Sequence, residues 1–365
     1  MKVSCILALF FSVTPVWAAT MPAFTKFEKS AFAVQPKSEV VVNMPRVQSQ
    51  DTLGLCYSFA TSAILTAENC RIMKKDCKSL PDSEIFSPVD LARFGNQPDG
   101  EVGFESSYRG IREGGPGAFT LEIAGTFVGS SASQECLSLD KILGKMGGAQ
   151  FGTDAQLAAF KRLRKKYDEY QKIDRNCETC LTDFFATAKT EMDKDFNLDT
   201  DPTRLLKAFS EETYEKFFDR LIYPKECSRA KNRAYFEGKD STELKVFPQK
   251  GQKADYASVM AQIKKQLGNG HPVMISGICL NEKYTKDCSA PGVEGGNQHA
   301  TVISGYRRVC DKANKCYDAL QIHNSWGQAW QDMHDGGWVD AESLLKYTGY
   351  ETEMLAWLED KPKGK

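Results

Sequence analysis

Cys56 is the residue of this sequence best placed to act as a nucleophile. A helix that begins at Cys56 would set the thiol against unpaired backbone N–H groups and the positive end of the helix dipole, and both favour the thiolate. Gly54 allows a sharp turn close to a substrate, and Gln50 could place an amide N–H beside the same reacting carbonyl. The alternative is a buried or disulfide-bonded cysteine at a helix start. The helix itself is predicted from apolar residues at three-and-four spacing: Phe59, Ala60, Ala63, Ile64 and Ala67.

A thiol nucleophile needs a base, and the chain has four histidines. His299 follows a glycine-bearing loop and opens a predicted strand, a place from which a side chain can point into a cleft. Asn324 supplies an amide that could orient the imidazole. Because successive strand residues face opposite ways, Asn324 can reach this site only if His323 does not. Taken singly, each histidine of the chain is more often structural than catalytic.

Five short motifs occur in an order that resembles the papain family of cysteine peptidases. Each motif is weak alone, and the order of all five makes the resemblance specific. It covers about residues 45–135 and 255–358. The motifs are Gln50, the run 54–59 around Cys56, Glu113-Gly114-Gly115, the strand from His299 to Tyr306, and Asn324-Ser325-Trp326-Gly327.

The resemblance implies a role for each matching residue. Cys56 would be the nucleophile, held as a thiolate by an imidazolium at His299. Asn324 would fix the histidine ring, and Trp326 would shield that contact from water. Gln50 and the Cys56 backbone N–H would form the oxyanion hole.

The resemblance also implies peptide hydrolysis through a thioester, with no metal or cofactor. Gly114 and Gly115 would pair with the substrate backbone, while Pro116 and Gln298 would touch the substrate pocket. Two other functions stay open. Similar Cys-His geometry serves acyl transfer between amines in transglutaminase-like enzymes, and the chain could be a catalytically silent binding module.

The sequence departs from the family at several points. Tyr57 follows the nucleophile where the family usually has Trp, and Leu53 stands where a cysteine is usual. Extra sequence separates His299 from Asn324. The block 137–240 has no counterpart in a typical member, and only about 25 residues lie between the leader and the catalytic region, too few for a large inhibitory prosegment.

Residues 1–18 read as a secretory signal peptide, with Lys2, an apolar run over 3–13 and the small-residue pattern before a cut after Ala18. We therefore expect a secreted or periplasmic protein. The net charge of −1 gives no reason to expect nucleic acid or an anionic membrane as a partner. We expect a monomer that acts on protein or peptide substrates.

The cysteine count predicts one free thiol. The chain has 12 cysteines, and Cys5 lies in the leader, so 11 remain in the mature chain. In an oxidising compartment an even set pairs, which leaves Cys56 as the odd one. Short separations favour the pairs Cys70–Cys77, Cys279–Cys288 and Cys310–Cys316. The connectivity of Cys136, Cys177, Cys180 and Cys227 stays open, and Cys177-x-x-Cys180 is only weakly suggestive of a redox or metal motif.

Helical patterns come first and strands later, which favours an α+β fold. Specifically, we expect the two-lobed papain-like fold: an extension over 19–44, a helical lobe over 45–136 with the nucleophile, a helical insertion over 137–240, and a strand-rich lobe over 241–365 with His299 and Asn324. The insertion could cap or narrow the cleft. Its predicted buried faces are Leu157, Phe160, Leu163, Tyr167 and Tyr170, then Leu205, Leu206 and Phe209. Strands are expected at 272–278, 300–306, 319–323 and 337–339.

Overall fold

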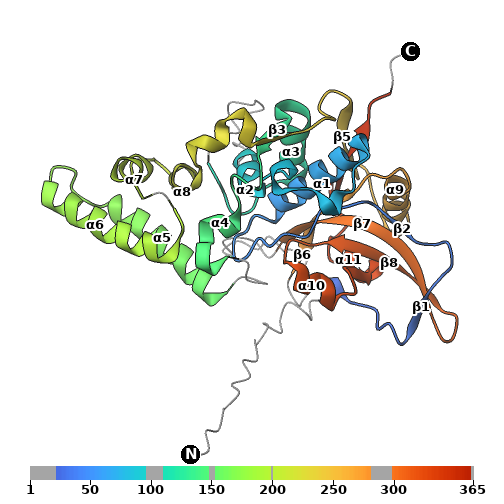
Figure 1. Ribbon diagram of the computed structural model, residues 1–365. Coiled ribbons are helices and arrows are strands. Elements are labelled where there is room, and N and C mark those ends of the chain that lie inside the picture. The colour runs from blue at the N-terminus through green and yellow to red at the C-terminus, as the bar shows by residue number, and fades with distance from the viewer. Residues whose placement is uncertain (1–21, 96–109, 148–152, 199, 281–297, 363–365) are drawn as a thin grey trace, which may run out of the picture.

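A buried helix, α1 (Cys56–Met73), runs through the middle of the molecule (Figure 1). The sequence predicts one apolar face, yet the helix is buried on all sides from Cys56 to Cys70. Three of its buried hydroxyls donate to nearby carbonyls: Ser58 to Leu55 O at 2.9 Å, Thr61 to Tyr57 O at 2.9 Å and Ser62 to Phe86 O at 2.6 Å. Small side chains and internally bonded hydroxyls therefore let other elements pack around α1.

The structure describes residues 22–95, 110–147, 153–198, 200–280 and 298–362, and the predicted leader lies outside them. Helices and an antiparallel sheet are combined, in agreement with the α+β class. The main sheet has the strand order β5-β10-β6-β7-β8-β9. These strands are β5 (Thr242–Phe247), β10 (Leu355–Asp360), β6 (Val273–Cys279), β7 (Gln298–Asp311), β8 (Cys316–His323) and β9 (Trp338–Asp340).

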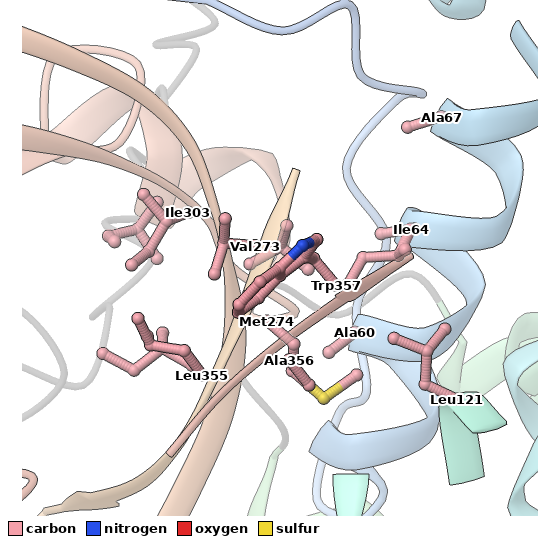
Figure 2. Close-up of a cluster of buried hydrophobic side chains, with 14 of the residues drawn as sticks. Ala60, Ile64, Ala67, Leu121, Val273, Met274, Ile303, Leu355, Ala356 and Trp357 are labelled. Carbon is pink, nitrogen blue, oxygen red and sulfur yellow. The ribbon is translucent and has the colours of Figure 1, made fainter. Parts of the chain in front are cut away.

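The four strands expected from the sequence are present, while β5 and β10 were not predicted. One face of this sheet packs on α1. The close-up in Figure 2 draws Ala60 and Ile64 of α1 beside Met274 of β6 and Trp357 of β10, all of them buried. Burial of such side chains stabilises the fold by about 1.5–3 kcal/mol for each large one.

The N-terminal extension belongs to this sheet. After the short 3₁₀ turn Pro22–Phe24 the chain forms two short strands, β1 (Phe32–Val34) and β2 (Val40–Val41). Both pair with the second half of β7, and the first half of β7 pairs with β6. The sequence predicts only extended chain here. The described pairing of β6 with β7 ends at Ile303, so the edge of β7 after that residue can bind these two short strands.

Short helices flank the start of α1. Ser87 caps α2 (Pro88–Leu91), as the Ser-Pro pair predicts, and accepts the Asp90 N–H at 3.2 Å. The next helix begins as α3 (Gly117–Glu122) and continues as a π-helical turn, Ile123–Val128. The strand β3 (Ser130–Ala132) then pairs with β4 (Arg233–Tyr235) in a second, small sheet.

The block between β3 and β4 is helical, as predicted, and projects away from the main sheet (Figure 1). Most of the predicted buried positions are buried, but Leu157 and Leu206 are 41% and 47% exposed. Leu157 lies in the first turn of its helix, and Leu206 lies about 100° around the helix from Leu205, which fills the core. The helices are α4 (Leu139–Leu143), α5 (Asp154–Tyr170), α6 (Glu178–Asp195), α7 (Pro202–Phe209) and α8 (Tyr214–Ile222).

This helical block shares one hydrophobic core with the first turn of α1. The cluster joins Cys56, Tyr57 and Phe59 to buried residues of the block such as Phe160 and Phe217. The core of the block is therefore continuous with the buried residues around Cys56. Three further α-helices occur in the same part of the chain as the strands of the main sheet. They are α9 (Tyr256–Gly268), α10 (Gln328–Met333) and α11 (Ala341–Lys346).

Candidate active site

Cys56 is the first residue of α1 and, among the described residues, the one free cysteine. The residue before the helix, Leu55, provides no side-chain cap. The backbone N–H groups of Ala300, Tyr57 and Cys56 act to lower the pKa of the thiol. The predicted position of the thiol at an open helix start is therefore present in the structure.

His299 and Asn324 form a direct pair on neighbouring strands. His299 lies near the start of β7, and Asn324 follows the last residue of β8. The ring Nε2 of His299 lies 2.8 Å from Asn324 Oδ1. A carboxamide oxygen only accepts hydrogen bonds, so Nε2 carries the proton and Nδ1 is left as an acceptor. His323 belongs to β8 and does not take part, as the strand alternation predicts.

Three distant segments meet at this site. Ala300, the residue directly after His299, lies in one buried cluster with Cys56, and its backbone N–H acts to lower the pKa of the thiol. The indole of Trp326 lies tilted against the His299 ring, with 4.7 Å between centroids. Cys56, His299 and Asn324 are all buried, with 9%, 3% and 0% of their surface exposed. The fold thus collects the thiol, the imidazole and the amide in one water-poor place.

Burial decides the protonation of this pair in the substrate-free protein. It raises the pKa of the Cys56 thiol, against which the three backbone N–H groups act. It lowers the pKa of His299 to about 4, against which the hydrogen bond to Asn324 acts. Both directions favour the neutral thiol and neutral imidazole. The expectation of a resting thiolate and imidazolium is therefore not what these pKa directions favour, because desolvation outweighs the helix start.

Gln50 is held in place by the strand-like run that contains Asn324. The Gln50 N–H donates to Ser325 O at 2.8 Å, and the Gly327 N–H donates to Gln48 O at 3.2 Å. Ser325 Oγ also donates to Gln50 Oε1 at 2.5 Å, and Gln50 Nε2 donates to Leu53 O at 2.8 Å. Gln50 therefore has a fixed oxygen end, and its amide nitrogen keeps a second N–H for another acceptor.

The hydrogen bond from Ser325 to Gln50 was not predicted from the sequence. The position of Ser325 between Asn324 and Trp326 was the available signal, but the sequence does not indicate which residue its hydroxyl would bind. The contact becomes visible only once residues 48–50 and 325–327 lie side by side.

The predicted glycine strip runs beside Cys56. Gly114 donates its N–H to Gly54 O at 2.7 Å, has φ of +72°, and has open space where a Cβ would lie. A Cβ on Gly115 would come within 2.9 Å of the Tyr57 ring. Tyr57 is itself fixed by hydrogen bonds to Ala92 O at 3.1 Å and Arg112 O at 2.9 Å. Tyr57 thus supports a bare stretch of backbone that is hydrogen-bonded to Gly54, two residues before Cys56.

Two further predicted contacts lie at the margins of the site. Pro116 is exposed and directly precedes α3. Gln298 is exposed and pairs with Cys279 at the start of β7, one residue before His299. Within the described structure neither side chain hydrogen-bonds to Cys56, His299 or Asn324, so contact with a substrate remains a prediction for both.

The other two histidines serve the scaffold. His271 Nδ1 lies 2.9 Å from the buried carboxylate of Glu68 on α1. His334 stacks on Trp330, with 4.0 Å between ring centroids. This agrees with the expectation that most histidines of the chain are structural.

The disulfides follow the local predictions and settle the open ones. Cys70–Cys77 and Cys310–Cys316 are bonded as predicted, and the pairs left open are Cys136–Cys227 and Cys177–Cys180. Cys279 is also disulfide-bonded, and its predicted partner Cys288 lies outside the described residues. Cys177 and Cys180 thus form a disulfide at the start of α6.

Within the described ranges, no three or more His, Cys, Asp or Glu side chains are grouped so that they could hold a metal ion. None of the helices in these ranges combines the length and the apolar content that a membrane span requires.

Comparison with known proteins gives little beyond this geometry. No protein-family model matches the chain, and no curated protein sequence matches it. Among solved structures, the recombinant stem bromelain precursor is a distant structural neighbour, with 13% sequence identity and a TM-score of 0.35. The match covers 93% of this chain and 75% of that one. A similarity this distant carries no argument about activity.

Proposed function

We propose that this chain is an exported papain-like cysteine endopeptidase. The observation that supports it most is the convergence of a free thiol, an imidazole and an amide from three distant segments. In particular, the His299 ring lies 2.8 Å from Asn324, and Ala300, the residue after His299, belongs to the same buried cluster as Cys56. The order of the motifs in the sequence supports the same proposal.

The geometry suggests the course of the reaction. His299 Nδ1 takes the thiol proton as the Cys56 sulfur bonds to the carbonyl carbon of the peptide. The oxyanion that forms receives hydrogen bonds from the Gln50 amide and a backbone N–H of the α1 start. The histidine then returns the proton to the leaving amine, the C–N bond breaks, and a thioester remains. Water, deprotonated by His299, cleaves the thioester and restores the thiol.

A neutral resting pair is compatible with this course. The proton moves over one short path, and charge separation develops when the substrate carbonyl is in place to receive it. Asn324 stabilises the imidazolium that forms, because its oxygen accepts the Nε2–H in both protonation states.

The architecture supports a two-lobed assignment. The buried α1 and its flanking helices form one side of the site, and the main sheet with His299 forms the other. We propose residues 45–136 and 241–365 as the two lobes, with 19–44 added to the sheet and 137–240 inserted behind the nucleophile. The disulfides fit an oxidising compartment, which supports export by the predicted leader.

Product analysis separates this proposal from its alternatives. The protein is incubated with an unmodified peptide mixture, with and without an added primary amine, and the products are identified by mass. We expect free carboxyl and amino ends at internal peptide bonds in both samples. Amine-linked products as the main species would favour the transferase, and no products together with an unreactive Cys56 would favour the binding module.

The helical insertion reaches the substrate side of the site through Glu113, the residue before the glycine pair. Burial raises the pKa of the Glu113 carboxyl, and the Gly54 N–H and the charge of Arg164 act against that rise. Arg164 belongs to α5, and its guanidinium lies 4.6 Å above the ring of Tyr214 on α8. Two insertion helices therefore approach the backbone that we expect to bind the substrate.

We expect Arg164→Ala to lower kcat/KM for peptides by up to about fivefold, because partly exposed charge contacts contribute ~1 kcal/mol or less. The rate of labelling by a small thiol-directed epoxide should not change, since that reagent is too short to reach the insertion. Arg162→Ala is the matched control, because Arg162 lies on the same helix and pairs with Asp195 instead. Equal kinetics for both variants would favour a purely structural insertion. Point variants are preferable to deletion, because the block shares its core with α1.

A further inference from the structure

Phe24 lies against the candidate active site although it is separated from His299 by most of the chain. It belongs to the 3₁₀ turn Pro22–Phe24, and only 2% of its surface is exposed. Its ring meets those of His299, Trp326 and Trp330 edge-on, with centroid distances of 6.2, 5.5 and 5.3 Å. Edge-to-face contacts within 7 Å are favourable and directional.

The turn that carries Phe24 is anchored to the sheet behind the site. The Asp340 N–H donates to Thr25 O at 2.7 Å, and Thr25 Oγ1 donates to Pro22 O at 2.9 Å. Lys26 forms an antiparallel bridge with Val339 of β9. These bonds hold the backbone on both sides of Phe24, so its ring has a defined place.

We infer that Phe24 is a positioning residue, which wedges Trp326 against the His299 ring and thereby holds the imidazole in its bond to Asn324. This inference rests on the proposed function. It makes the N-terminal segment a part of the active site, where the sequence analysis saw only an extension. The contacts of the ring carry it: two of its three aromatic partners are His299 itself and the indole that covers His299.

The physical reason is that the His299–Asn324 bond fixes only one ring nitrogen. A single hydrogen bond leaves the imidazole free to rotate about that contact. Aromatic rings packed on its faces and edges prevent this rotation. A shift of about 1 Å at a reacting group can lower a rate on the order of 100-fold. Loss of the Phe24 ring should therefore affect turnover more than substrate binding, which depends on the glycine strip.

The test compares Phe24→Ala with Phe27→Ala. Phe27 lies in the same segment but packs on Phe32 and Tyr317, away from His299. We expect Phe24→Ala to lower kcat by about 10- to 100-fold with KM nearly unchanged, and Phe27→Ala to keep wild-type kinetics. Phe24→Leu retains an apolar filler and should lose several-fold in kcat, which keeps the test valid if the alanine variant does not fold.

A second readout does not depend on hydrolysis. The titration of His299 is followed by NMR in each variant. Burial lowers its pKa to about 4, and access of water to the site left by the ring should move this pKa upwards towards 6.5 in Phe24→Ala but not in Phe27→Ala. Alkylation of Cys56 as a function of pH should change in the same variant.

These readouts separate the two proposals. Equal kcat and equal His299 titration in the Phe24 variants and in Phe27→Ala would overturn the positioning role. A wild-type protein that hydrolyses no peptide would overturn the proposed function, while the titration and alkylation would still decide the role of Phe24.

Discussion

Cys56→Ala should abolish peptide hydrolysis, with a loss of at least about 10⁴-fold in kcat. The substitution removes the only atom that could form the thioester, and in comparable hydrolases loss of the nucleophile leaves little more than binding and oxyanion stabilisation. The measurement is the release of amino ends from a peptide substrate. In parallel, a thiol-directed epoxide should add one reagent mass to the wild-type peptide that contains residue 56.

Cys56→Ser provides the control for folding. It keeps the shape of the side chain at a site where backbone N–H groups surround the sulfur, and a hydroxyl without a strong base is a far weaker nucleophile. We expect its thermal midpoint to stay close to that of the wild type while hydrolysis and labelling are lost. Hydrolysis at the wild-type rate by either variant would remove Cys56 from the reaction, as would peptide mapping that finds this residue in a disulfide.

The central groups of the site could be predicted because each leaves a local signal. A cysteine at the start of an apolar helical pattern, a histidine after a glycine-bearing loop and an asparagine followed by Ser-Trp-Gly are visible without a structure. Strand alternation predicted that Asn324 and His323 face opposite sides. The observed hydrogen bond between Asn324 and His299 agrees with this prediction. Their order along the chain was the reason to assign these separate motifs to one site.

The contacts that hold these groups could not be predicted, because they join segments far apart in sequence. Phe24 is one of several apolar residues in an unpatterned stretch, and nothing local indicates that its ring meets His299. The edge of β7 that binds β1 and β2 is free because the pairing with β6 ends at Ile303, and the part that binds β1 lies beyond the predicted strand. Protonation also depends on burial, which is why a helix start alone suggested a thiolate while the buried pair favours the neutral form.

The cysteines show the same limit. Separations of six and seven residues made Cys310–Cys316 and Cys70–Cys77 predictable, since a short loop brings two thiols together at little entropic cost. The bond between Cys136 and Cys227 spans 91 residues. It closes the helical block near β3 and β4, whose pairing the sequence did not indicate.

Gln50→Ala should lower kcat by about 10²- to 10³-fold with little change in KM, which is the usual effect of removing one oxyanion donor. The reason is that Gln50 Nε2 donates one N–H to Leu53 O and keeps a second N–H, which we expect to bind the oxyanion. Peptide kinetics measure the effect. Epoxide labelling of Cys56 should persist in this variant, because the thiol and His299 are untouched.

Ser325→Ala tests how this donor is aimed. Ser325 Oγ donates to Gln50 Oε1 at 2.5 Å, so its loss frees the amide to rotate and should lower kcat by about tenfold, the kinetic equivalent of ~1.4 kcal/mol. Because Ser325 acts only through Gln50, the double variant should be no slower than Gln50→Ala alone. Additive losses would mean that Ser325 contributes by another route, for example through the backbone pairing of residues 48–50 with 325–327. A Ser325→Ala variant with wild-type turnover would mean instead that the Leu53 carbonyl suffices to orient the amide.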